Sequence, residues 1–114
     1  IVMTGELKES VSRVFFATHV RTVSGVVITG QRFPDEGKYF ECDGTDRAFK
    51  VTFSFKMVML PGVYFVGGGV WSESEPTLCH RILDALMFRL VSDQGARSFG
   101  YMDASNNEPA LELL

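Results

Sequence analysis

The sequence predicts an all-β protein folded as an antiparallel β-sandwich, and three observations lead to this prediction. Residues 48–60 alternate strictly between apolar and polar side chains, which fits a strand with one buried and one wet face. Turn-forming residues recur between short β-rich runs along the rest of the chain. Pro61-Gly62 is followed by Tyr64 and an apolar run, an order typical of the tyrosine corner of immunoglobulin-like sandwiches. The predicted sandwich is therefore immunoglobulin-like, with a structural role for Pro61, Gly62 and Tyr64.

The first part of the chain is expected to hold a hairpin. Residues 1–10 are weakly patterned and fit the end of a strand followed by a polar loop. Residues 13–21 alternate in the manner of a strand, and the β-branched run 26–29 reads as a second, shorter strand. Between them, residues 22–25 favour a turn in which Gly25 takes a positive φ.

The middle of the chain divides into a polar loop and two strands. Residues 30–47 are rich in Gly, Asp and Pro and predict a loop, within which residues 38–41 can pair briefly as a strand. Residues 48–60 form the clearest strand, and residues 63–71 form the next strand around the tyrosine corner. On this second strand, the face expected in the core carries Tyr64, Val66, Gly68 and Val70.

The last part of the chain is predicted to add two strands. Residues 82–91 form the first of these, although a short amphipathic helix from Thr77 competes with that interpretation. The core side of this strand should carry Leu86, Phe88 and Leu90. Residues 97–102 form a possible last strand, and the end of residues 103–114 fits either a helix or a strand that pairs with another chain.

Length and charge limit what the chain can be. At 114 residues, it is expected to form one domain over residues 1–114. A net charge of −3 without a basic block argues against nucleic acid as a partner. Cys42 and Cys79 are too few for a disulfide scaffold, so one disulfide and two reduced thiols both stay open. The chain does not begin with Met, which suggests a fragment of a longer protein.

Motifs for cofactors, metals and catalysis are absent from the sequence. The three glycines at 67–69 are not followed by the Lys-Ser/Thr of a P-loop, and no dinucleotide fingerprint or nucleophile elbow occurs. The neighbouring pair Cys79-His80 lacks the further ligands that a metal site needs. We therefore expect no cofactor, no metal and no catalytic residue. A glycosidase with two convergent carboxylates remains a minor alternative.

One face of the predicted sheet is aromatic where it should be polar. Strands 13–21, 63–71 and 82–91 are neighbours in an immunoglobulin-like sheet, and their outward positions carry rings, arginines and glycines. Such a face marks a binding groove or an interface. The candidate carbohydrate-binding residues on it are Trp71, Arg21, His19, Arg89, Gly67, Gly69 and Phe65.

The chemistry of this face suits a sugar. Trp71 can cover the apolar side of a pyranose, Arg21 and Arg89 can bind hydroxyl or acidic groups, and His19 can supply a hydrogen bond. The two glycines would form a flat floor, or they would instead accommodate a β-bulge or a large neighbouring side chain. A dimer interface or a covered second core is the alternative for the whole face.

The order of LPGVYFVGGG (residues 60–69), a polar loop, LDALMFRLV (residues 83–91) and Gly100 resembles the C-terminal domain of Wzt-type ABC transporter subunits. The earlier hairpin followed by VVITG also fits that family, so the resemblance covers residues 12–100. These subunits export O-antigen polysaccharide. The resemblance implies a carbohydrate-binding sandwich that is not an enzyme and that docks the modified terminal end of a finished glycan.

The same resemblance implies partners and a location. An ATPase domain would lie elsewhere in the full-length subunit, which would work with a membrane transporter subunit. The domain would form a homodimer, in some family members by exchange of a C-terminal strand, at the cytoplasmic side of the bacterial inner membrane. The alternative is an immunoglobulin-like interaction or dimerisation module that binds no glycan.

Overall fold

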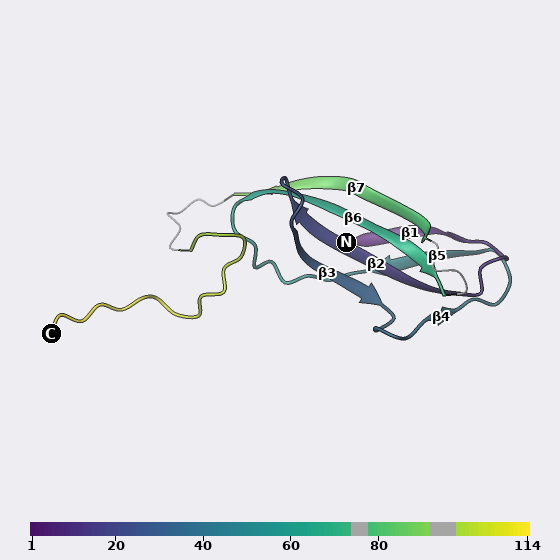
Figure 1. Ribbon diagram of the computed structural model, residues 1–114, viewed down its shortest axis with the longest axis horizontal. Coiled ribbons are helices and arrows are strands. Elements are labelled where there is room, and N and C mark those ends of the chain that lie inside the picture. The colour runs from purple at the N-terminus through teal and green to yellow at the C-terminus, as the bar shows by residue number, and fades with distance from the viewer. Residues whose placement is uncertain (74–77, 92–97) are drawn as a thin grey trace.

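All regular secondary structure in the part of the chain that the structure describes is β-strand. The computed structural model (Figure 1) describes residues 1–73, 78–91 and 98–114. The strands are β1 (Val2–Leu7), β2 (Arg13–Thr22), β3 (Val27–Phe33), β4 (Phe40–Glu41), β5 (Arg47–Thr52), β6 (Gly62–Ser72) and β7 (Leu78–Leu90). Every strand pairing is antiparallel, so the prediction of an all-β antiparallel fold is confirmed.

The strands form two sheets of unequal size. The large sheet has the order β3-β2-β6-β7, with the short β4 also paired to β2, and the small sheet contains only β1 and β5. Leu7 of β1 packs against Val14, Phe16 and Val70 of the large sheet, so the small sheet lies over one face of the large one. The predicted neighbours 13–21, 63–71 and 82–91 are indeed adjacent, as β2, β6 and β7.

The core lies between the two sheets. Alternate residues of β2 are buried along its whole length, which is the period-two pattern of a strand with one inward face. One cluster contains Leu7, Val14, Phe16, Phe53 and Val70, and a second contains Val20, Tyr64 and Val66. The even-numbered residues of β6 contribute to both clusters, on the face that the sequence predicts.

Tyr64 connects the turn before β6 to the core. Its side chain is 3% exposed, and its hydroxyl donates a hydrogen bond of 2.5 Å to the carbonyl oxygen of Leu60. Its ring lies 5.4 Å from that of Phe88 on β7. This bond back to the chain before the strand is the geometry of a tyrosine corner.

The predicted strand 48–60 is wrong in its second half. β5 ends at Thr52, which pairs with Val2 at the start of β1, so the residues that follow have no strand of the small sheet beside them. Phe53 stays buried, but Met57 is 61% exposed although its place in the pattern predicted a core position. The alternation in the sequence indicates a strand correctly, but it does not show where the partner strand β1 ends and the pairing stops.

Three further boundaries differ from the sequence prediction. Residues 30–33 belong to β3 because their pairing with β2 continues from Gly30 to Phe33. The helix from Thr77 is wrong, since β7 begins at Leu78, four residues before the predicted strand. Of the possible last strand, residues 98–102 form only a single bridge, between Met102 and Met59.

Candidate functional site

The candidate site is the outer face of the large sheet, which points away from β1 and β5. Paired residues on adjacent strands share a face. Phe15 lies opposite Trp71, His19 opposite Gly67, and Arg21 opposite Phe65. By the same register, the outer face includes Phe15, Ala17, His19, Arg21, Arg32, Phe65, Gly67, Gly69, Trp71, Arg81, Met87 and Arg89.

Stacked rings and arginines occupy one end of the outer face. The rings of Phe15 and Trp71 are nearly parallel, with centroids 5.2 Å apart and an interplanar angle of 5°. The Arg32 guanidinium carbon lies 3.7 Å from the centroid of the Phe15 ring. Tyr39 meets Phe15 edge-on at 6.0 Å, and Arg13 lies 5.4 Å from the Tyr39 centroid. We call these five residues the aromatic–arginine cluster.

The two candidate floor glycines are explained by close packing. A Cβ at Gly69 would lie 3.0 Å from the Trp71 indole and 2.6 Å from the His80 carbonyl oxygen. A Cβ at Gly67 would meet the carbonyl oxygens of β7, where residues 83–85 bulge opposite this single residue, and the His19 ring at 2.7 Å. The rings of His19 and Trp71 therefore lie close against the sheet at these two positions.

Arg21 and Phe65 lie beside His19, toward the other end of the outer face. Arg21 donates hydrogen bonds to the Asp84 carboxylate, from Nε at 2.9 Å and from Nη2 at 2.6 Å. The same guanidinium carbon lies 5.4 Å from the centroid of the Phe65 ring. The Arg21 charge is thus already paired, and a ligand would have to share this arginine with Asp84.

Arg89 lies far from Trp71 on the same face. Arg89 pairs with Val63, whereas Trp71 is eight positions further along β6, which corresponds to about 26 Å of strand. A single sugar cannot reach both residues. The structure thus brings Trp71, Gly69, Gly67 and His19 together, places Arg21 and Phe65 next to them, and sets Arg89 apart.

His19 is held as a neutral imidazole near pH 7. Burial lowers the pKa of His19 below 6.5, and the positive charges of Arg81 and Arg21 lower it further, while Asp84 acts in the opposite direction. A neutral imidazole offers one hydrogen-bond donor and one acceptor. This suits it to recognise a hydroxyl group.

Three residues of this region were missed by sequence reasoning. Arg81 lies on the outer face opposite Gly69, but the predicted strand began one residue after it. Arg32 and Tyr39 fell within the predicted loop 30–47. The alternation Ile28, Gly30, Arg32 was too short and too polar to extend the predicted strand, so only the register with β2 reveals Arg32.

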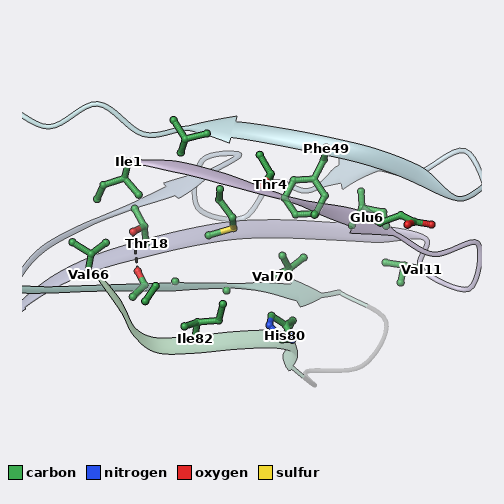
Figure 2. Close-up of a pocket in the computed structure, with 18 of the residues that line it drawn as sticks. Ile1, Thr4, Glu6, Val11, Thr18, Phe49, Val66, Val70, His80 and Ile82 are labelled. Atoms are coloured by element: carbon green, nitrogen blue, oxygen red, sulfur yellow. Dashed lines mark hydrogen bonds between the residues drawn. The ribbon is translucent and has the colours of Figure 1, made fainter. Parts of the chain in front are cut away.

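A groove of about 630 Å³ lies on the opposite side of the large sheet, between β1 and the strands β6 and β7. Figure 2 shows Val66, Val70 and Ile82 pointing from the large sheet toward β1. Ile82 is 48% exposed and Leu86 is 50% exposed in this groove. Leu86 was expected in the core, but the two-stranded small sheet does not extend over it.

The described residues contain no group of three or more His, Cys, Asp or Glu side chains placed to hold a metal ion. Across residues 1–73, 78–91 and 98–114, no helix has the length and apolar character to cross a membrane.

Comparison with known proteins identifies the family. A solved crystal structure of the C-terminal domain of wzt is similar, with a TM-score of 0.69 and 16% sequence identity over 96% of this chain and 68% of that chain. At this identity the similarity establishes the fold alone. A search of curated protein sequences finds no significant match. The family model of the Wzt C-terminal domain matches residues 1–104. The chain therefore belongs to the Wzt C-terminal domain family.

Proposed function

We propose that this domain binds the terminal end of an O-antigen polysaccharide and couples that recognition to export by an ABC transporter, without catalysing a reaction. The observation that carries the proposal is the outer face, where Trp71, His19 and several arginines lie side by side on a sheet. Membership of the Wzt C-terminal domain family supports the same role.

The proposed binding mode uses the end of the face that holds Trp71. The indole packs against the apolar side of a terminal sugar ring, as aromatic side chains do in ligand pockets. His19 exchanges a hydrogen bond with a hydroxyl group, and Arg81, which sequence reasoning missed, supplies an exposed cation opposite Gly69. Gly67 and Gly69 act indirectly, by letting the two rings lie close to the sheet.

The remaining candidates suit a longer ligand. Arg21 and Phe65 would contact a second sugar. Arg89 would be reached only by a glycan of several sugar units that lies along β6. The affinity should be modest, because a sugar end on an open sheet buries little area. We place the domain at the cytoplasmic side of the bacterial inner membrane, within a longer subunit that carries the ATPase domain and works with a membrane transporter subunit.

The test measures whether the purified protein binds O-chains that carry their terminal modification and O-chains that lack it. The readout is the fluorescence of Trp71, which is the only tryptophan in the sequence. Saturable binding that requires the terminal group is expected. Trp71→Ala should abolish binding, here measured by calorimetry, while Phe99→Ala, an exposed aromatic residue outside the face, should not. Absence of binding across a broad glycan panel by a folded protein would contradict the proposal.

The groove favours a second role, dimerisation. Among the described strands β1 pairs only with β5, so its other edge borders the groove. The C-terminal segment, residues 103–114, is extended, and all of its residues are exposed. Leu111 and Leu113, at alternate positions, are each 88% exposed. We propose that the chain forms a homodimer in which this segment of one copy adds beside β1 of the other.

The two roles use opposite sides of the large sheet and can be separated. Trp71→Ala should remove glycan binding and leave the dimer intact. If Trp71→Ala instead separates the dimer, the outer face is the protein interface, and the domain is an interaction module rather than a glycan receptor.

A further inference from the structure

A stack of three side chains crosses the outer face from strand to strand. Arg32 comes from β3, Phe15 from β2 and Trp71 from β6, and these strands are consecutive neighbours in the large sheet. The guanidinium lies 3.7 Å from the Phe15 centroid, and the Phe15 ring lies 5.2 Å from the indole with an angle of only 5°. Phe15 therefore connects Arg32 to Trp71.

The loop between β3 and β4 fixes the Arg32 side chain. Its Nε donates a hydrogen bond to the Pro34 carbonyl oxygen at 3.2 Å, and its Nη2 donates one to the Lys38 carbonyl oxygen at 2.9 Å. Its guanidinium carbon also lies 5.4 Å from the centroid of Tyr39. Two donors held at fixed angles set the plane of the guanidinium, which a lysine ammonium cannot reproduce.

We propose that Arg32 is a positioning residue for glycan recognition: it orients Phe15 and, through Phe15, the indole plane of Trp71. This inference rests on the proposed function, in which Trp71 contacts a glycan. The loop 34–39 thereby contributes to the glycan site by holding Arg32, although β2 separates this loop from Trp71. An indole ordered before binding loses less conformational freedom when the sugar arrives.

Arg32 acts through another side chain, so its effect must appear in the free protein. With a single tryptophan in the chain, the fluorescence of the unliganded protein reports on Trp71 alone. Arg32→Lys keeps the positive charge but loses the planar contact with Phe15. We expect acrylamide to quench Trp71 more efficiently in this variant and its near-UV circular dichroism to weaken.

Binding should change in parallel. Loss of the close cation–π contact with Phe15, a partly exposed ring, should weaken glycan binding about 2- to 5-fold. Arg47→Lys is the matched control, since Arg47 is an exposed arginine on β5 that pairs with Asp43. It should leave quenching, dichroism and binding at wild-type values.

A double-substitution cycle separates positioning from a general effect on the fold. If Arg32 acts through Phe15, Arg32→Lys should produce no further change in quenching once Phe15→Leu has removed the connecting ring. Additive changes would overturn the proposal, as would wild-type quenching and dichroism in Arg32→Lys, or altered quenching with unchanged glycan affinity. If the wild-type protein binds no glycan, the proposed function fails, and the quenching cycle alone still decides whether Arg32 orients Trp71.

Discussion

The Tyr64 hydroxyl is a polar atom placed in an apolar core, and its single bond to Leu60 explains why it is tolerated there. In Tyr64→Phe the ring still fills its place, but the buried carbonyl oxygen of Leu60 loses its donor. We expect a loss of about 1–2 kcal/mol in the free energy of unfolding.

Urea unfolding would measure this loss. Tyr101→Phe is the matched control, because the Tyr101 side chain is about half exposed, and it should leave the unfolding midpoint unchanged. Equal midpoints for Tyr64→Phe and the wild type would show that the corner bond adds nothing to stability.

His19 gives the protein a dependence on pH. Its pKa in the folded protein is lowered by burial and by the charges of Arg81 and Arg21, so the unfolded chain binds a proton more readily. The stability contributed by His19 is therefore present above pH 6.5 and is lost as the pH falls from 6.5 through the lowered folded pKa.

Two measurements check this prediction. NMR titration of the His19 ring should give a pKa below 6.5. Urea unfolding of His19→Gln should show a smaller loss of stability than the wild type over the same acid range. A ring that titrates above 6.5 would mean that Asp84, rather than burial and the two arginines, dominates its surroundings.

At the scale of strands, the glycine run decides how closely neighbouring strands approach β6. Gly67 faces the bulge of β7 and the ring of His19, while Gly68 faces Met3 of β1 on the inner side. A methyl group at Gly67 would collide with backbone carbonyl oxygens, which cannot move without breaking the pairing of β6 with β7. We expect Gly67→Ala to cost about 2–4 kcal/mol of unfolding free energy.

Gly5→Ala is an informative comparison for this prediction. A Cβ at Gly5 would also be too close to a neighbour, at 2.7 Å, but that neighbour is the end of the Phe49 ring, which can shift. Thermal unfolding should therefore show a clearly smaller effect for Gly5→Ala. Similar melting temperatures for Gly67→Ala and the wild type would mean that the bulge rearranges at little cost.

The strands also show what sequence patterns could and could not predict. β2 was predicted closely because alternate residues are buried over its full length, and β6 because its apolar and turn residues mark both of its ends, although residues 66–70 are buried without alternation. Residues 53–58 carry the same alternation but lack a strand to pair with, and no local pattern reveals the length of a partner. The prediction of a loop for residues 30–33 is wrong for the converse reason. Their sequence is polar, but β2 lies beside them and pairs with them as a strand.

The outer face followed from the same alternation, but the arrangement on it did not. Sequence reasoning grouped Trp71, His19 and Arg21 on one face because β2 and β6 were assigned correctly. Pairing of Arg21 with Asp84, and stacking of Arg32 on Phe15, depend on side chains that come together only through register. The 26 Å or so between Arg89 and Trp71 likewise becomes visible only along an assembled strand.

The molecule as a whole is an unequal sandwich with a long extension. Its Cα radius of gyration is 18.7 Å, against about 13 Å for a compact domain of this length. Figure 1 shows the C-terminal segment extending away from the sheets, and the longest dimension is 70 Å. Apolar side chains are thus exposed both on this segment and in the groove beside β1.

The proposed homodimer joins these two exposed surfaces, which gives a prediction for the assembly. A strand beside β1 would present Leu111 and Leu113 to the groove, while Glu112 would point to the opposite face. The double variant Leu111→Glu/Leu113→Glu would bury two carboxylates against Ile82 and Leu86, and we expect it to be a folded monomer. Light scattering coupled to size exclusion would measure the mass of the particle.

Side chains alternate between the two faces of a strand, so Glu112, between the two leucines, provides the control for the proposed homodimer. Glu112→Gln changes a residue on the outward face and should remain a dimer. If the double variant also remains a dimer, the leucines do not enter the groove. The exposed side chains of Ile82 and Leu86 on β7 would then have to be buried by a different segment or partner. Because the groove and the glycan face lie on opposite sides of the large sheet, the monomer should still bind glycan through Trp71, with loss of any avidity that two linked sites provide.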